Sequence, residues 1–173
     1  MCYSLSGEGV QTGVPAVFIR FADRTEVRAA DLLTANDVAK LARICSFHCR
    51  WAVLTGVEPA LQLDSDLVDA LHAVGFNIAI ETSGTAALDA FALDWITLVS
   101  PIGGSELRVK RVDEIRYTVR HGDPIPAPPV PARNYVLSPP VDGDRIDPND
   151  LEWCIRLVKN HPQWRLSTPR QKV

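Results

Sequence analysis

The chain has 173 residues, 46% of them hydrophobic, and a formal net charge of −3 at pH 7. This length and composition predict one domain over residues 1–173 with a sizeable core. The charge excludes a general affinity for nucleic acid or for an anionic membrane. We see no signal peptide and no run near the ~18 apolar residues of a membrane span, and four cysteines are too few for a secreted disulfide framework. We therefore expect a cytoplasmic protein.

Short β-branched runs alternate along the chain with amphipathic runs of helical length. Strands are predicted at residues 16–20, 51–55, 76–80, 95–99, 106–109, 135–138 and 164–167. Helices are predicted at residues 34–41, at 66–74, and from residue 148 to just before Pro162. Continuous apolar strands separated by helices indicate an α/β fold with a parallel sheet that is buried on both faces.

The predicted helix starts have recognisable capping residues. Thr34 followed three residues later by Asp37 is a plausible capping box. Asp147 followed by Pro148 reads as an N-cap and a first helical position. Five prolines at positions 124–131 indicate an irregular connection before the predicted strand at 135–138.

Three polar segments follow predicted strands directly. They are residues 55–58, 81–84 and 100–101. Since ligands bind at the carboxyl ends of parallel strands, we expect these segments to meet at one edge of the sheet and to form a site. The alternative is that their Gly and Ser residues only make turns.

Four segments in fixed order resemble one family, the 7-carboxy-7-deazaguanine synthases, which are radical S-adenosylmethionine (SAM) enzymes of the queuosine pathway. The segments are Ser6-Gly7-Glu8-Gly9, Leu54-Thr55-Gly56-Val57-Glu58-Pro59, Ile80-Glu81-Thr82-Ser83-Gly84-Thr85 and Trp164-Arg165-Leu166-Ser167. Residues 13–21, residues 100–101 and residues 161–167 are also similar to family segments, so the resemblance covers nearly the whole chain.

The resemblance implies a trimmed, incomplete (β/α) barrel with mostly parallel strands, usually dimeric. It also implies a lyase-type reaction that converts 6-carboxy-5,6,7,8-tetrahydropterin to 7-carboxy-7-deazaguanine. In the family, a [4Fe–4S] cluster cleaves SAM reductively to a radical, and magnesium assists the ring contraction. The expected ligand is therefore a pterin or a purine.

The resemblance also assigns residues. Substrate contacts would come from Leu5, Ser6, Gly7, Glu8, Arg20 and Thr55, and SAM contacts from Gly56, Val57, Glu58, Ser100 and Pro101. Arg20 would pair with a substrate carboxylate, and Glu8 would accept from an amine edge. Glu8 as a turn residue, Arg20 paired to an acid such as Asp23, and Glu58 in a structural role are the alternatives.

The chain departs from the family where the cluster should be. Phe21 runs into residues 22–28 without any cysteine, whereas thiolates hold such clusters, so we expect the cluster and the magnesium to be absent. Cys45 and Cys49 are candidate metal ligands, and His48 would have to complete such a site. The alternative is that they are ordinary thiols at a helix end. Val57 also replaces a family glycine.

These departures leave two hypotheses. The chain is a 7-carboxy-7-deazaguanine synthase-like protein that cannot do the radical chemistry alone, and borrowed activity would require a partner chain to supply the cluster. Alternatively, it is a cluster-less pseudoenzyme: a pterin- or purine-binding or protein-interaction module that forms a homodimer, or a heterodimer with an active paralogue.

Overall fold

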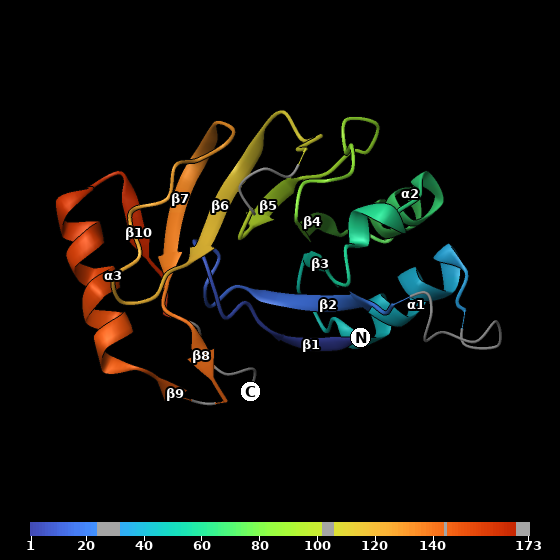
Figure 1. The fold of residues 1–173 in the computed structure, drawn as a ribbon. Helices are drawn as coiled ribbons and strands as arrows, with labels where there is room; N and C mark the ends of the chain where they lie inside the picture. Colours follow the sequence, from blue (N-terminus) through green and yellow to red (C-terminus); the bar gives the residue numbers. More distant parts are fainter. Residues whose placement is uncertain (24–31, 102–105, 144, 169–173) are drawn as a thin grey trace.

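The computed structural model of the protein describes residues 1–23, 32–101, 106–143 and 145–168. In this part of the chain, eight strands form one curved sheet in the order β1-β2-β3-β4-β5-β6-β7-β10 (Figure 1). Its strands are β1 (Cys2–Leu5), β2 (Pro15–Phe21), β3 (Trp51–Gly56), β4 (Asn77–Thr82), β5 (Trp95–Val99), β6 (Val112–Thr118), β7 (Ala132–Ser138) and β10 (Trp164–Leu166). Neighbours from β2 to β10 are parallel, and β1 is antiparallel to β2. The predicted incomplete, mostly parallel barrel is confirmed.

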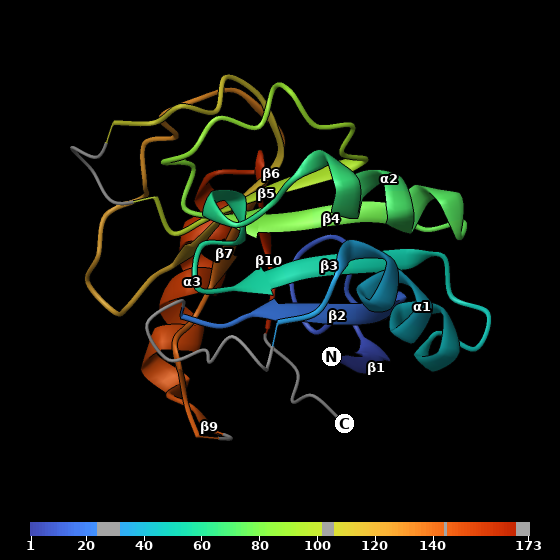
Figure 2. The ribbon, with the colours of Figure 1, turned by 90° about the vertical axis from the view of Figure 1, so that its right-hand side faces the viewer.

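In the described residues, three α-helices cover the sheet in two groups. They are α1 (Ala35–Cys45), α2 (Ser65–Ala73) and α3 (Pro148–Asn160). Figures 1 and 2 show α1 and α2 together beside β2, β3 and β4, and α3 beside β7 and β10. A short antiparallel hairpin of β8 (Val141–Asp142) and β9 (Arg145–Ile146) precedes α3. No helix in the described ranges has the length and apolar character needed to cross a bilayer.

Strands β2 to β4 are buried on both faces, as expected for parallel strands under helices. On the helix side, Val17, Leu54 and Ile80 join the main core with residues of α1 and α2. On the opposite side, Phe18 and Val53 belong to a second small cluster. Alternation along each strand therefore sends every second side chain into the barrel interior, where the site lies.

The predicted caps of α1 and α3 are confirmed, and α2 begins one residue before its predicted start. The Thr34 hydroxyl accepts a hydrogen bond from the Asp37 amide at 3.2 Å at the start of α1. The Asp147 carboxylate accepts from the Asn149 amide at 2.7 Å at the start of α3, with Pro148 in the first turn. Both caps satisfy a backbone donor that the helix itself leaves without a partner.

The predicted strand at residues 106–109 is wrong, and the strand lies at Val112–Thr118 instead. Leu107 and Val109 do pack against the core, and the Arg108 amide donates a hydrogen bond to the Gly84 carbonyl, but the segment forms no strand in the described structure. Strand β1 was not predicted either. Residues 24–28, where a family cysteine loop would begin, lie outside the described residues.

Candidate functional site

The carboxyl ends of β3, β4 and β5 meet at one edge of the sheet, as predicted. The Thr55 hydroxyl at the end of β3 donates to Glu81 Oε2 on β4 at 2.7 Å. Together these strand ends border an open cavity of about 430 Å³. It is lined by Thr55, Gly56, Glu58, Pro59, Glu81, Thr82, Ser83 and Val99. Ser100 and Pro101 come directly after Val99, and the Ser100 amide donates to the Arg116 carbonyl at 2.7 Å.

The Glu58 carboxylate ties the end of β3 to the end of β4. It accepts from the Thr82 hydroxyl at 2.6 Å, from the Ser83 amide at 2.8 Å, from the Ser83 hydroxyl and from the Ala60 amide at 3.3 Å. Four donors from the protein itself use most of the capacity of one carboxylate. The geometry thus favours a structural role for Glu58.

Gly56 and Val57 form a tight crossing over the end of β2. Gly56 has φ +114°, and a Cβ built on it would lie 2.2 Å from the Phe21 carbonyl oxygen, so only glycine fits here. The Val57 amide donates to the same carbonyl at 3.0 Å, and its side chain is exposed beside the cavity. The segment that the resemblance assigns to SAM is therefore packed against β2.

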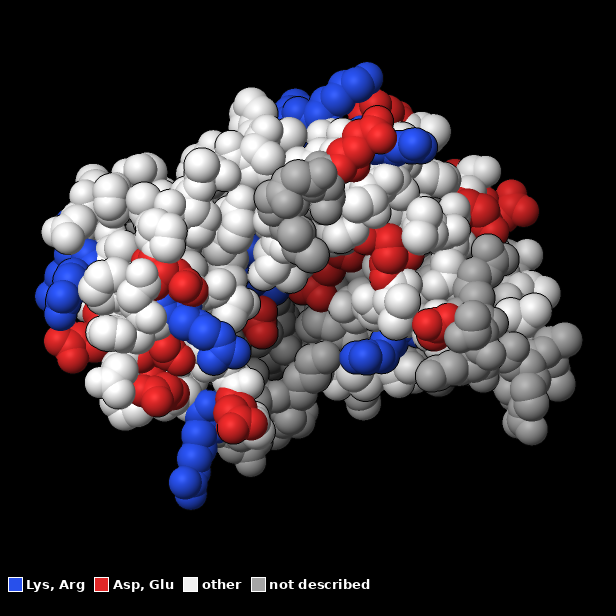
Figure 3. All heavy atoms as spheres, in the orientation of Figure 1, with Lys and Arg blue, Asp and Glu red and all other residues white. Residues whose placement is uncertain are grey.

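The N-terminal loop and the barrel interior enclose a second cavity of about 170 Å³. Its lining consists of Ser6, Gly7, Glu8, Phe18, Glu81, Val99 and Arg116. Three of the predicted substrate residues, Ser6, Gly7 and Glu8, therefore meet here, while Leu5 is exposed at the end of β1. Figure 3 shows acidic atoms gathered in the hollow at the centre of this face.

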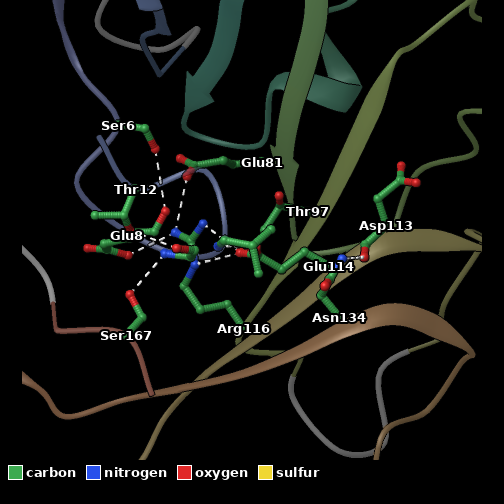
Figure 4. A network of polar contacts seen from close by, with 12 residues as sticks. Ser6, Glu8, Thr12, Glu81, Thr97, Asp113, Glu114, Arg116, Asn134 and Ser167 are labelled. Atoms are coloured by element: carbon green, nitrogen blue, oxygen red, sulfur yellow. Dashed lines mark hydrogen bonds and ion pairs between the residues drawn. The ribbon is translucent and has the colours of Figure 1, made fainter. Parts of the chain in front are cut away.

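A network of charges forms the wall of this second cavity (Figure 4). Arg116 Nη1 donates to Glu8 Oε2 at 2.8 Å and to Glu81 Oε1 at 3.2 Å. Its Nη2 and Nε donate to Glu114 Oε1 at 2.9 and 3.1 Å. Burial opposes the charged guanidinium, but Glu114, Glu81 and Glu8 outweigh burial, and the pKa of Arg116 is raised above its ordinary value.

Two further contacts hold the loop that carries Glu8. The Val10 amide donates to Glu114 Oε2 at 2.8 Å, and the Gly9 amide donates to Ser167 Oγ at 2.9 Å. A Cβ on Gly9 would lie 2.2 Å from Glu114 Oε1, so the loop backbone packs directly on this carboxylate. The loop is thus fixed from β6 and from the residue after β10.

Sequence reasoning missed the residues that organise the cavity. Glu81 and Ser167 lie in motifs that the sequence analysis identified but had no role assigned, and Glu114 and Arg116 were not identified at all. The available signal was the charged pair Glu114 and Arg116, two residues apart and hence on one face of a strand. The failure to predict β6 concealed that pair.

Arg20 lies elsewhere. Its exposed side chain lines a different groove with Phe21, Gln62 and neighbouring residues, and it is not among the residues that line the cavity around Glu8. Its assignment to a substrate carboxylate stays a prediction.

The cysteines do not fit a [4Fe–4S] cluster at this edge of the sheet. Cys45 ends α1, and Cys49 precedes β3, where its thiol contacts the Trp51 carbonyl at 3.7 Å. Both therefore lie at the amino end of β3, roughly 20 Å of strand away from its carboxyl end. All four cysteines are free thiols, and the described residues contain no group of three His, Cys, Asp or Glu placed to hold a metal ion.

No protein-family model matches the chain. The 7-carboxy-7-deazaguanine synthase of Bacteroides thetaiotaomicron is 35% identical over 179 residues, covering 99% of this chain and 93% of that protein. The enzyme of that name from Burkholderia multivorans is 38% identical over 204 residues, covering 98% and 93%. The crystal structure of QueE from Escherichia coli has the same fold, with a TM-score of 0.74 at 24% identity, covering 99% of this chain and 92% of that one. The identity to the two curated relatives over nearly the full length shows that this chain belongs to the 7-carboxy-7-deazaguanine synthase family.

Proposed function

We propose that the chain binds a pterin or 7-deazapurine of the queuosine pathway and cannot perform the family's radical reaction by itself. The observation that carries the proposal is the cavity around Glu8 and Glu81, which lies beside strand ends that carry no cysteine. The names of the relatives support the pathway.

The cysteine inventory supports the loss of the cluster. A [4Fe–4S] cluster is held by thiolates, and the family uses three with SAM on the fourth iron. This sequence has no cysteine between Cys2 and Cys45. Both alignments are also longer than the 173 residues of this chain, so the two relatives carry residues that this chain lacks.

The charges of the cavity support a ligand with N–H donors. Three carboxylates surround one guanidinium, so this network carries a formal charge of about −2. Two of the carboxylates, Glu8 and Glu81, line the cavity and present oxygen acceptors to it. The amine edge of a pterin or a deazaguanine supplies matching donors. SAM, when bound in the family, supplies the radical precursor. Of the residues assigned to SAM here, Gly56 and Glu58 line the neighbouring cavity of about 430 Å³. In that cavity the Glu58 carboxylate and the Thr55 hydroxyl are already bonded to protein groups.

A role as a dimer partner is the second candidate, and one surface favours it. Ile44 and Phe47 are 78% and 71% exposed at the end of α1, and Leu41 on the same helix is also exposed. The Phe47 ring contacts Tyr3 of β1, with 5.4 Å between the ring centroids. Contiguous exposed apolar side chains of this kind are typical of interaction surfaces. The partner would be a second copy or an active paralogue.

The first experiment is anaerobic reconstitution with iron and sulfide, followed by iron counting, the thiolate-to-iron absorption spectrum and a SAM cleavage assay. The proposal expects no stable four-iron cluster and no cleavage. A stable cluster with SAM cleavage would refute it.

Ligand binding is tested by thermal shift with 6-carboxypterin. The proposal expects stabilisation that Glu8→Gln abolishes and that Glu152→Gln, on the exposed face of α3, leaves intact. Arg20→Ala separately tests the predicted carboxylate contact. If no pterin and no deazapurine stabilises the protein, only the interaction role remains.

A further inference from the structure

Among the described residues, the hydrogen bonds of the Arg116 side chain all go to carboxylates. Its Nη1 is shared between Glu8 and Glu81, and its other nitrogens donate to Glu114. The Arg116 side chain is 10% exposed, whereas those of Glu8 and Glu81 are 42% and 30% exposed. All three residues line the cavity, but the two carboxylates are its more exposed charged groups and the guanidinium is largely covered.

We propose that Arg116 is a positioning residue: it holds Glu8 and Glu81 side by side as ionised acceptors for one ligand and does not bind the ligand itself. The proposal rests on the ligand-binding function inferred above. A guanidinium is planar with fixed N–H directions, so two carboxylates that share one of its nitrogens are held in a defined relative orientation. A lysine would supply the charge without this geometry.

The charge of Arg116 is as important as its shape. The charged groups that face it in the described residues are Glu8 of the N-terminal loop, Glu81 of β4 and Glu114 of β6. Without the guanidinium, three carboxylates would lie close together, and their repulsion would raise the pKa of at least one of them. A protonated carboxyl presents a donor where the ligand needs an acceptor.

The loop that carries Glu8 is also held by two hydrogen bonds that do not involve Arg116. Glu114, whose side chain is 1% exposed, accepts from the Val10 amide, and Ser167 accepts from the Gly9 amide. Substitution of Arg116 is therefore expected to misdirect the two ligand-facing carboxylates while the loop backbone stays attached.

The test compares wild type with Arg116→Met, Arg116→Lys and the control Arg133→Met. The control removes an exposed arginine whose Nη1 lies 3.6 Å from Asp113 Oδ1. Calorimetry gives the Kd of 6-carboxypterin at pH 5.5 and pH 7.0. For wild type and for the control, the Kd should change less than twofold between the two pH values. Arg116→Met should bind about tenfold more weakly at pH 5.5 than at pH 7.0, and Arg116→Lys should recover most of that loss, because an ammonium keeps the carboxylates ionised.

Two results would overturn the proposal. One is a wild-type affinity and a flat pH profile in Arg116→Met. The other is an equal loss at both pH values that lysine does not recover, since that pattern indicates direct ligand contact or general damage.

Thermal unfolding without ligand tests the positioning role independently of the proposed function. In Arg116→Met the raised carboxyl pKa belongs to the folded state, so protonation favours folding and the Tm deficit against wild type should shrink from pH 7.5 to pH 5. A deficit that is constant with pH would contradict the proposal. If 6-carboxypterin fails to bind wild type, the proposed function fails while this comparison still decides the role of Arg116. Arg116→Gln replaces the methionine variant if that variant does not fold.

Discussion

Two glycines of the N-terminal loop provide a matched test of the packing against Glu114. Gly9 and Gly13 both have positive φ, +74° and +87°. A Cβ on Gly13 meets nothing within 4 Å, whereas a Cβ on Gly9 would lie 2.2 Å from Glu114 Oε1. Gly9→Ala and Gly13→Ala therefore share the backbone strain and differ in the contact with the carboxylate.

The expected magnitudes follow from these contacts. An alanine in the left-handed region costs about 1 kcal/mol, and this alone applies to Gly13→Ala. In Gly9→Ala the Glu114 carboxylate must also move, which weakens its bonds to the Val10 amide and to Arg116. Hydrogen bonds to charged groups contribute about 1.5–3 kcal/mol, so we expect Gly9→Ala to cost about 3 kcal/mol in total.

Urea denaturation followed by circular dichroism gives both free energies of unfolding. The reasoning requires Gly9→Ala to lose about 2 kcal/mol more than Gly13→Ala. Equal losses, within about 0.5 kcal/mol, would mean that the loop does not pack on Glu114 and that the cavity wall is not built as described. A larger loss in Gly13→Ala would contradict the strain argument as well.

Three further outcomes are expected. Ser138→Ala should leave the stability unchanged or raise it by about 1 kcal/mol, because the buried Ser138 hydroxyl has no hydrogen-bond partner among the described residues; a loss in urea unfolding would show a missed partner. Burial, together with the charges of Asp150 and Asp123, raises the pKa of the Cys154 thiol to about 11. Alkylation of the folded protein at pH 8, followed by mass spectrometry, should therefore modify the exposed Cys2 and spare Cys154. Early labelling of Cys154 would contradict its burial. Glu58→Ala should cost about 2–3 kcal/mol in thermal or urea unfolding, since the carboxylate joins β3 to β4; an unchanged stability would argue that Glu58 serves a ligand instead.

The fold was largely predictable because its signals are local. Thr34 and Asp147 begin helices through bonds to amides two or three residues away, which the sequence displays directly. The polar segments after β3 and β4 follow from the rule that parallel strands end at one edge. The convergence of Thr55 with Glu81 was therefore an accessible prediction.

The centre of the site was not predictable in the same way. Glu114 and Arg116 sit on a strand whose charges resemble those of a solvated segment, and their burial makes sense only with partners far away in the sequence. Arg116 and Glu8 are 108 residues apart, and Val10 and Glu114 are 104 apart. Neither periodicity nor propensity carries information about such pairs, since a buried charge is tolerated only where the folded chain supplies its counter-charge.

The hydrogen bond between the Gly9 amide and Ser167 Oγ joins residues 158 positions apart, and this affects when the loop can be fixed during translation. At roughly 5–20 residues per second, translation delivers Ser167 about 8–30 s after the loop that it fastens. Until then the early strands can pair, but the loop that lines the cavity around Glu8 lacks one of its hydrogen bonds. A ligand is therefore expected to stabilise the finished chain and to give little help to a nascent one.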